Sequence, residues 1–82
     1  MQQFTRLSAI PCGASAVVEK IEGKKEMIER LHDLGMIRNT RVSCHFSSAF
    51  GDPRAYLVRD TLIAIRNLDA SRILCRVDGG NV

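Results

Sequence analysis

The sequence contains no tryptophan and few other aromatic residues, which argues against one common kind of peptide-binding site. Its rings are Phe4, Phe46, Phe50 and Tyr56 in a chain of 82 residues. A groove that recognises proline-rich peptides needs several exposed aromatic side chains. Strand alternation predicts that Phe46 and Tyr56 face inward, so too few rings remain for such a groove.

Long apolar runs and long runs of one charge are also missing. No stretch approaches the ~18 consecutive apolar residues of a membrane-spanning helix, and the N-terminus lacks the pattern of a secretory signal. The longest basic run is Lys24-Lys25, and 12 Lys and Arg are interspersed with 9 Asp and Glu. A nucleic-acid-binding domain gathers its basic residues on one stripe. We therefore expect a cytoplasmic protein with no nucleic-acid partner and no direct membrane insertion.

The cysteines and histidines do not have the spacing of a metal site. The candidate ligands are Cys12, His32, Cys44, His45 and Cys75, and no two of them form a C-x-x-C or H-x-x-x-H pair. Cys44 and His45 are neighbours on a predicted strand and point to opposite faces, which also disfavours a Cys-His nucleophile pair. Cys44 and Cys75 fall in register with apolar residues, as core cysteines do. The sequence predicts no metal ligands, no cofactor and no disulfide framework.

Other catalytic motifs are absent as well. Neither G-x-x-x-x-G-K-[ST] nor G-x-G-x-x-G occurs, so nothing indicates a phosphate-cradling loop. The carboxylates are scattered along the chain and form no pair at a spacing typical of acid-base catalysis. We expect that the protein is not an enzyme.

One segment has the period of an amphipathic helix. Within residues 24–34, Met27, Leu31 and Leu34 recur at i, i+4 and i+7, while charged residues occupy the other faces. Gly35 follows as a stop signal. The pattern predicts one short α-helix that turns these three apolar side chains inward.

Five segments have the composition and alternation of strands. Val42, Cys44 and Phe46, for example, alternate with polar residues and are predicted to face inward. So few strands can bury one face only by curling, which predicts a mainly β fold, a small antiparallel SH3-like or OB-like barrel with one helix after the first strand. We expect a single domain over residues 1–82, with 78–82 a loose tail. The predicted strands are residues 16–21, 41–47, 54–59, 62–66 and 72–77.

A succession of short motifs resembles the FeoA family. From the helix onward they follow the family's order and spacing: Arg30-Leu31, Leu34-Gly35-Met36, Thr40, Gly51-Asp52-Pro53, Val58-Arg59, Ala64-Ile65-Arg66 and Ala70. Upstream, Leu7-Ser8, Gly13 and Val17-Val18 resemble the family's opening strand. Asn39 and Asp60 stand where the family usually has glycine, and both residue types tolerate positive φ.

The resemblance implies an SH3-like barrel and a small cytoplasmic accessory to FeoB, a membrane ferrous-iron transporter with a GTP-binding domain. The expected partner is the cytosolic G-protein region of a FeoB-type transporter or a companion Feo protein, bound in a regulatory role. Transition-metal ion binding is implied only for the family in general. The alternatives are a homo-oligomeric scaffold and an interaction domain like that at the C-terminus of DtxR-type repressors.

Apolar residues that loop position or alternation places outside the barrel are the candidate contact surface. We expect Arg59 and Arg66 to steer an acidic partner, or to bridge strands. The alternative for the apolar residues is that scattered exposed side chains are normal and that Met36 fills one end of the barrel. The predicted interaction residues are Met36, Ile37, Phe50, Gly51, Asp52, Pro53, Leu57 and Arg59.

Overall fold

A computed structural model describes residues 3–77, and its main feature is a six-stranded sheet in which all neighbouring strands are antiparallel. The mainly β prediction is confirmed, and the predicted tail at 78–82 lies outside the described residues. The elements in chain order are β1 (Gln3–Arg6), the 3-10 turn η1 (Leu7–Ala9), β2 (Ser15–Ile21), α1 (Lys25–Asp33), β3 (Arg41–Ser47), β4 (Arg54–Val58), β5 (Thr61–Ile65), α2 (Asn67–Ala70) and β6 (Ile73–Val77).

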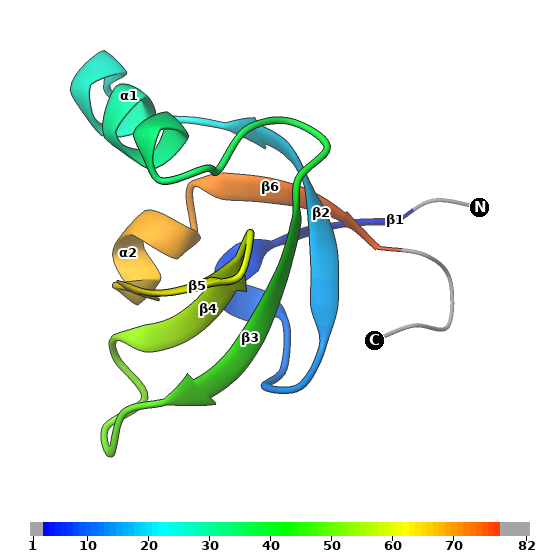
Figure 1. Cartoon of the computed structure of the whole chain (residues 1–82), viewed down its shortest axis with the longest axis vertical. Helices are drawn as coiled ribbons and strands as arrows, with labels where there is room; N and C mark the ends of the chain where they lie inside the picture. Colours follow the sequence, from blue (N-terminus) through cyan, green and yellow to red (C-terminus); the bar gives the residue numbers. More distant parts are fainter. Residues whose placement is uncertain (1–2, 78–82) are drawn as a thin grey trace.

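The sheet bends around a single core. Its strand order is β1-β6-β2-β3-β4-β5, and Figure 1 shows the strong curvature, with α1 and α2 on the same side of the molecule. Tyr56, Cys44 and Cys75 face inward as predicted, and Val58 is buried with them in the core. The largest fully buried side chains are Tyr56, Leu7, Ile10, Met36, Ile73, Val18, Val42, Val58, Cys44 and Cys75.

The guanidinium of Arg54 joins β4 to η1 and to Ile10 just after it, in the segment that follows β1. It donates hydrogen bonds to the carbonyl oxygens of Leu7, Ser8 and Ile10 at 3.1, 3.1 and 2.8 Å. It also donates to the Tyr56 hydroxyl, at 2.8 Å from Nη2. Burial raises the pKa of that hydroxyl, although the hydrogen bond from Arg54 opposes the shift. The turn η1 directly follows β1, and β6, β2 and β3 lie between β1 and β4 in the sheet. By bonding β4 to the segment after β1, the Arg54 side chain therefore closes the curled sheet.

The first strand, β1, is not predicted by periodicity. Its sequence, QFTR, has no apolar alternation, and the strand is exposed or half-buried throughout. It pairs with β6 alone, with Gln3 opposite Val77 and Arg6 opposite Leu74. An edge strand of this kind is defined by its hydrogen-bonded neighbour rather than by a buried face, so the sheet has six strands instead of about five.

Phe46 is 57% exposed, so the prediction that it faces inward is wrong. Cys44 lies opposite Tyr56, but Phe46 lies opposite Ala55, which leaves His45 as an extra residue on β3. Such a β-bulge interrupts the pairing and redirects the strand. The alternation that buries Cys44 therefore does not continue to Phe46.

Met36 has no exposed surface, because the end of α1 turns it into the core. Gly35 adopts a φ of +100° and its N–H donates to the carbonyl of His32 at 2.9 Å. The Met36 N–H donates to the carbonyl of Leu31 at 3.0 Å. In this Schellman arrangement the residue after the left-handed glycine packs back on the last turns of the helix. The expected exposure of Met36 is wrong, and the alternative that it fills the barrel is confirmed.

The two positions at which this chain has Asn or Asp where similar sequences usually have glycine both adopt a left-handed backbone conformation, as predicted. Asn39 has a φ of 75° and Asp60 a φ of 68°. Arg59 also has a positive φ, 50°, which the sequence does not reveal. Since Val58 pairs with Thr61, Arg59-Asp60 is a two-residue hairpin loop with positive φ at both positions, the geometry of a type I′ turn.

Substitutions at Asp60 test the strain in this turn. Asp60→Gly should raise the free energy of unfolding by about 0.5 kcal/mol, because relief of left-handed strain outweighs the added entropy of the unfolded chain. Asp60→Val should lower it by about 1–2 kcal/mol, because a β-branched side chain clashes with the backbone at positive φ. Equilibrium urea unfolding measures both, and effects of the same sign would contradict the left-handed geometry.

Candidate functional site

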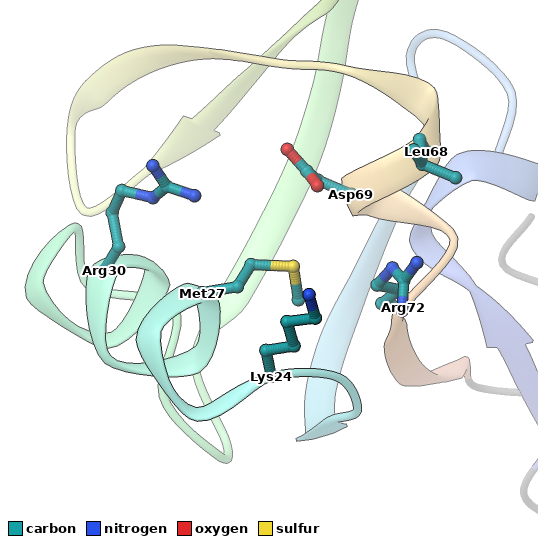
Figure 2. Close-up of a pocket in the computed structure, with 6 residues that line it drawn as sticks. All are labelled: Lys24, Met27, Arg30, Leu68, Asp69 and Arg72. Atoms are coloured by element: carbon teal, nitrogen blue, oxygen red, sulfur yellow. The ribbon is translucent and has the colours of Figure 1, made fainter.

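A groove between α1 and α2 combines exposed apolar side chains with positive charge. It consists of two adjoining hollows of about 170 and 250 Å³ that share Arg30 and Asp69. Figure 2 shows the first hollow, across which Met27 and Arg30 of α1 face Asp69 of α2. The first hollow is lined by Lys24, Met27, Arg30, Leu68, Asp69 and Arg72. The second is lined by Arg30, Leu31, Leu34, Ala64, Ile65, Arg66 and Asp69.

The floor of the groove is apolar and partly open to solvent. Leu31 and Ile65 are buried beneath it and Met27 is half-buried, so the inward face predicted for the helix is confirmed at Leu31. Leu34 is 44% exposed, contrary to the helical period, because it lies just past the end of α1. Leu68 is 67% exposed on α2. The groove therefore presents two accessible leucines.

Unpaired positive charge surrounds this floor. The basic side chains are Lys24, Arg30, Arg66 and Arg72. Within residues 3–77 none of them makes an ion pair, although the Asp69 carboxylate lies among them. Some arginines outside the groove are neutralised: Arg38 and Arg76 both donate to Glu19, and the hydrogen bond from Arg76 lowers the pKa of that carboxyl. The groove is therefore suited to an anionic or acidic ligand.

The loop of residues 48–53 is attached to α2. The Asn67 N–H donates to Asp52 Oδ1 at 2.8 Å, and Asn67 Nδ2 donates to the Gly51 carbonyl at 2.9 Å. The Asp52 N–H in turn donates to Ser48 Oγ at 3.0 Å. Two predicted interaction residues, Gly51 and Asp52, thus hold the beginning of α2, which forms one wall of the groove.

The predicted interaction residues do not form one continuous patch. Phe50, which is 96% exposed, and Pro53 precede β4, whereas Arg59 follows it. A strand of five residues at about 3.3 Å per residue separates the two groups by roughly 17 Å.

Exposure also differs among these residues. Ile37 is 39% exposed, Leu57 is half-buried and Met36 is buried. Arg59 lies beside Gly35, where an added Cβ would come within 3.4 Å of its Cδ. For the accessible members of the set, a contact role stays a prediction.

Comparison with known proteins identifies the family. The model of the FeoA domain matches residues 5–77. The chain belongs to the FeoA family. A comparison with curated protein sequences finds no significant match.

Solved structures of FeoA proteins have the same fold. The FeoA protein from Chlorobium tepidum is 23% identical with a TM-score of 0.85, over 95% of this chain and 78% of that one. FeoA from Stenotrophomonas maltophilia, complexed with zinc, is 27% identical with a TM-score of 0.77, over 94% and 93% of the chains. It is described as an SH3 domain protein and a candidate ferrous iron transport activating factor. The SH3-like prediction is thus confirmed.

Part of a longer protein also has a similar fold. IdeR from T. acidophilum is 21% identical with a TM-score of 0.78, and the match covers 92% of this chain but 34% of that one. This likeness concerns the fold alone.

The His, Cys, Asp and Glu side chains of the described residues are not arranged as metal ligands. Within residues 3–77, no three His, Cys, Asp or Glu side chains come together as a metal site requires. His32 and His45 are exposed, while Cys44 and Cys75 are buried in the core. The described donors therefore do not fit a zinc or iron site with three protein ligands. No helix in the same part of the chain is long and apolar enough to cross a bilayer.

Most of the groove is invisible in the sequence of the FeoA domain. The sequence indicates Arg66 only as a charge that steers a partner or bridges strands, and Leu68 lies outside every predicted helix and strand. A signal does exist, since Leu68 is a large apolar residue between the polar residues Asn67 and Asp69. Leu34, the other exposed leucine of the groove, is far from Leu68 in the chain. Only the tertiary structure places both leucines in the same groove.

Proposed function

We propose that this FeoA domain is a non-enzymatic, cytoplasmic accessory of ferrous iron transport that binds a FeoB-type transporter through the groove between α1 and α2. Family membership and the description of the Stenotrophomonas maltophilia protein support the general role. The observation that carries the proposed mode of action is the pair of exposed leucines, Leu34 and Leu68, surrounded by unpaired cations.

The groove defines the chemistry of its partner. An acidic segment that carries apolar side chains would bury one of them against Leu68 in the first hollow and another against Leu34 in the second. Its carboxylates would meet Arg30, Arg66 and Arg72. Apolar contacts at the centre of an interface supply most of its affinity, whereas charges at the rim mainly raise the association rate and fix the register. The partner segment is therefore an acidic, partly apolar stretch of the cytosolic G-protein region.

Regulation requires a difference in affinity between two states of the partner. A ligand that binds two states equally shifts no equilibrium. We therefore propose that the groove prefers one nucleotide state of the G-protein region. The preferred state then gains population when this domain binds.

Calorimetric titration of the reduced protein into the purified G-protein region of FeoB from the same organism tests the proposal. Binding should be saturable and should depend on the nucleotide. Leu68→Asp should weaken it at least about tenfold, because a carboxylate replaces an apolar contact and repels the acidic partner. Arg72→Glu should weaken binding and reduce its dependence on salt.

Leu62→Asp is the matched control for Leu68→Asp. Leu62 is a surface leucine like Leu68 and is 52% exposed. It lies on β5 and does not line the groove. The control should bind as the unmodified protein does. Equal affinities of the Leu68→Asp and unmodified proteins, with both folded, would reject the groove as the binding surface.

Self-association is the second candidate, favoured by the edges of the sheet. β1 and β5 are the end strands, and Phe4 and Leu62 on them are 56% and 52% exposed. Unpaired strand edges are templates for pairing with another chain. Sedimentation of the protein across a range of concentrations tests self-association. A dimer that Leu62→Asp dissociates would support a scaffold role, and a protein that stays monomeric at all concentrations would rule that role out.

A further inference from the structure

Two cysteine thiols that are far apart in the sequence are in contact. The Sγ atoms of Cys12 and Cys44 lie 3.3 Å apart, although the residues are 32 positions apart in the chain. In a disulfide the same two atoms are about 2.05 Å apart. Cys12 is exposed and Cys44 is buried, so one member of the pair is open to solvent.

Backbone hydrogen bonds hold the two cysteines together. The Gly13 N–H donates to the Cys44 carbonyl at 2.7 Å, and the Cys44 N–H donates to the Ala14 carbonyl at 3.0 Å. The Ala14 N–H donates to the Pro11 carbonyl at 3.0 Å, which places Cys12 in a tight turn. The turn is thus bonded to both backbone groups of Cys44, its N–H and its carbonyl. The two sulfur atoms can therefore approach each other by small side-chain rotations, without a change in the fold.

The two thiols have different surroundings. Burial raises the pKa of the Cys44 thiol, and the Arg54 guanidinium opposes that shift. A surface hollow next to Cys44 is lined by Gly13, Ser15 and Cys44 among others. Solvent therefore reaches the surroundings of the buried Cys44. Cys12 is therefore the thiol that meets a reagent first, and Cys44 is placed to react second.

We propose that Cys12 and Cys44 are a modification site, an oxidisable dithiol that small-molecule disulfides convert into an intramolecular disulfide. The Cys12 thiolate attacks one sulfur of the reagent, whose S–S bond breaks and releases one thiolate. Cys44 then gives its proton to solvent, and its sulfur attacks Cys12 Sγ, which displaces the second thiolate. Both released thiolates take up protons. Two protein thiols are oxidised and one reagent disulfide is reduced to two thiols.

Cys75 provides an internal comparison. It is fully buried, and burial raises the pKa of its thiol to about 11. The described residues place no second sulfur within hydrogen-bond distance of it. Cys75 should therefore stay a thiol under conditions that oxidise the other two cysteines.

The test is to incubate the reduced full chain with oxidised glutathione and to follow it by intact mass and peptide mapping. The expected product is a monomer lighter by two hydrogen atoms, in which the peptides containing Cys12 and Cys44 are linked. A cross-link across so long a segment restricts the unfolded chain. The midpoint of thermal unfolding should therefore rise by about 10 °C or more, and a reductant should reverse the rise.

Single variants separate the two steps. Cys44→Ala should stop at a stable glutathione adduct on Cys12, because no second thiol is present to displace it. Cys12→Ser, a change at an exposed position, should leave both remaining cysteines reduced. Cys75→Ala is the matched control for loss of a buried cysteine and should form the disulfide. A lasting glutathione adduct on Cys12 of the unmodified protein, or a dimer linked through Cys12 with Cys44 still reduced, would overturn the proposal.

Discussion

Arg54→Leu is expected to lower the free energy of unfolding by about 3 kcal/mol or more. The guanidinium donates to three carbonyl oxygens and to the Tyr56 hydroxyl. A hydrogen bond from a charged donor contributes about 1.5–3 kcal/mol, and the acceptors left without a partner in a partly buried site add a further penalty. Equilibrium urea unfolding, followed by circular dichroism, measures the change.

Two further variants show whether the fork geometry of Arg54 matters. Arg54→Lys keeps the charge but has no planar fork, so it should recover only part of the lost stability. Arg41→Leu removes an exposed guanidinium that donates to Ser15 Oγ, and it should change the free energy of unfolding by about 0.5 kcal/mol or less. If Arg54→Leu were as mild as Arg41→Leu, closure of the sheet by Arg54 would be disproved.

Met36→Ala is expected to lower the free energy of unfolding by about 2–4 kcal/mol. Met36 has no exposed surface and packs in the core, so truncation removes apolar contacts and leaves a cavity. Thermal and urea unfolding both report this loss. The result also decides between the two roles that the sequence allows, because a methionine on an exposed contact patch would lose little stability on truncation.

Ile37→Ala is the matched control for Met36→Ala. Ile37 is the next residue and is 39% exposed. Its truncation should lower the free energy of unfolding by about 1 kcal/mol or less. Similar losses for the two variants would contradict the Schellman geometry that turns Met36 inward.

Local patterns are sufficient to predict α1 and five of the six strands, but not β1 or α2. The helix predicted at 24–34 is observed at Lys25–Asp33, and the strand predicted at 41–47 is observed at Arg41–Ser47. Turn chemistry was equally informative at Asn39, whose side chain tolerates the positive φ that is observed. These features depend on neighbours in the chain, which is why the sequence reveals them.

Features that depend on tertiary pairing could not be predicted in this way. Phe46 is exposed because of a bulge that exists only in the pairing of β3 with β4. Met36 follows a helix stop that was predicted, but the direction in which the chain leaves Gly35 depends on two backbone hydrogen bonds. The spacing of Cys12 and Cys44 matches no short motif, so their contact appears only when the turn before β2 meets β3.

The candidate groove has the same origin. Its walls come from α1 and from α2, and three strands, β3, β4 and β5, lie between these helices in the chain. The sequence pattern predicts a contact surface made of exposed apolar loop residues such as Phe50. The structure adds a concave surface of two adjoining hollows, one lined by Leu68 and the other by Leu34, and a concave surface cannot be inferred from the exposure of single residues.

The place of β6 in the sheet has a consequence for how the protein is made. β6 lies between β1 and β2, and Gln3 at the start of β1 pairs with Val77 at the end of β6. During synthesis on the ribosome, β1 and β2 therefore wait for a central partner until nearly all of residues 3–77 have emerged. Contacts between such distant segments slow folding, and unpaired strands are prone to aggregate in the meantime. A nascent chain that stalls before β6 emerges therefore leaves the edges of β1 and β2 open to the wrong partners.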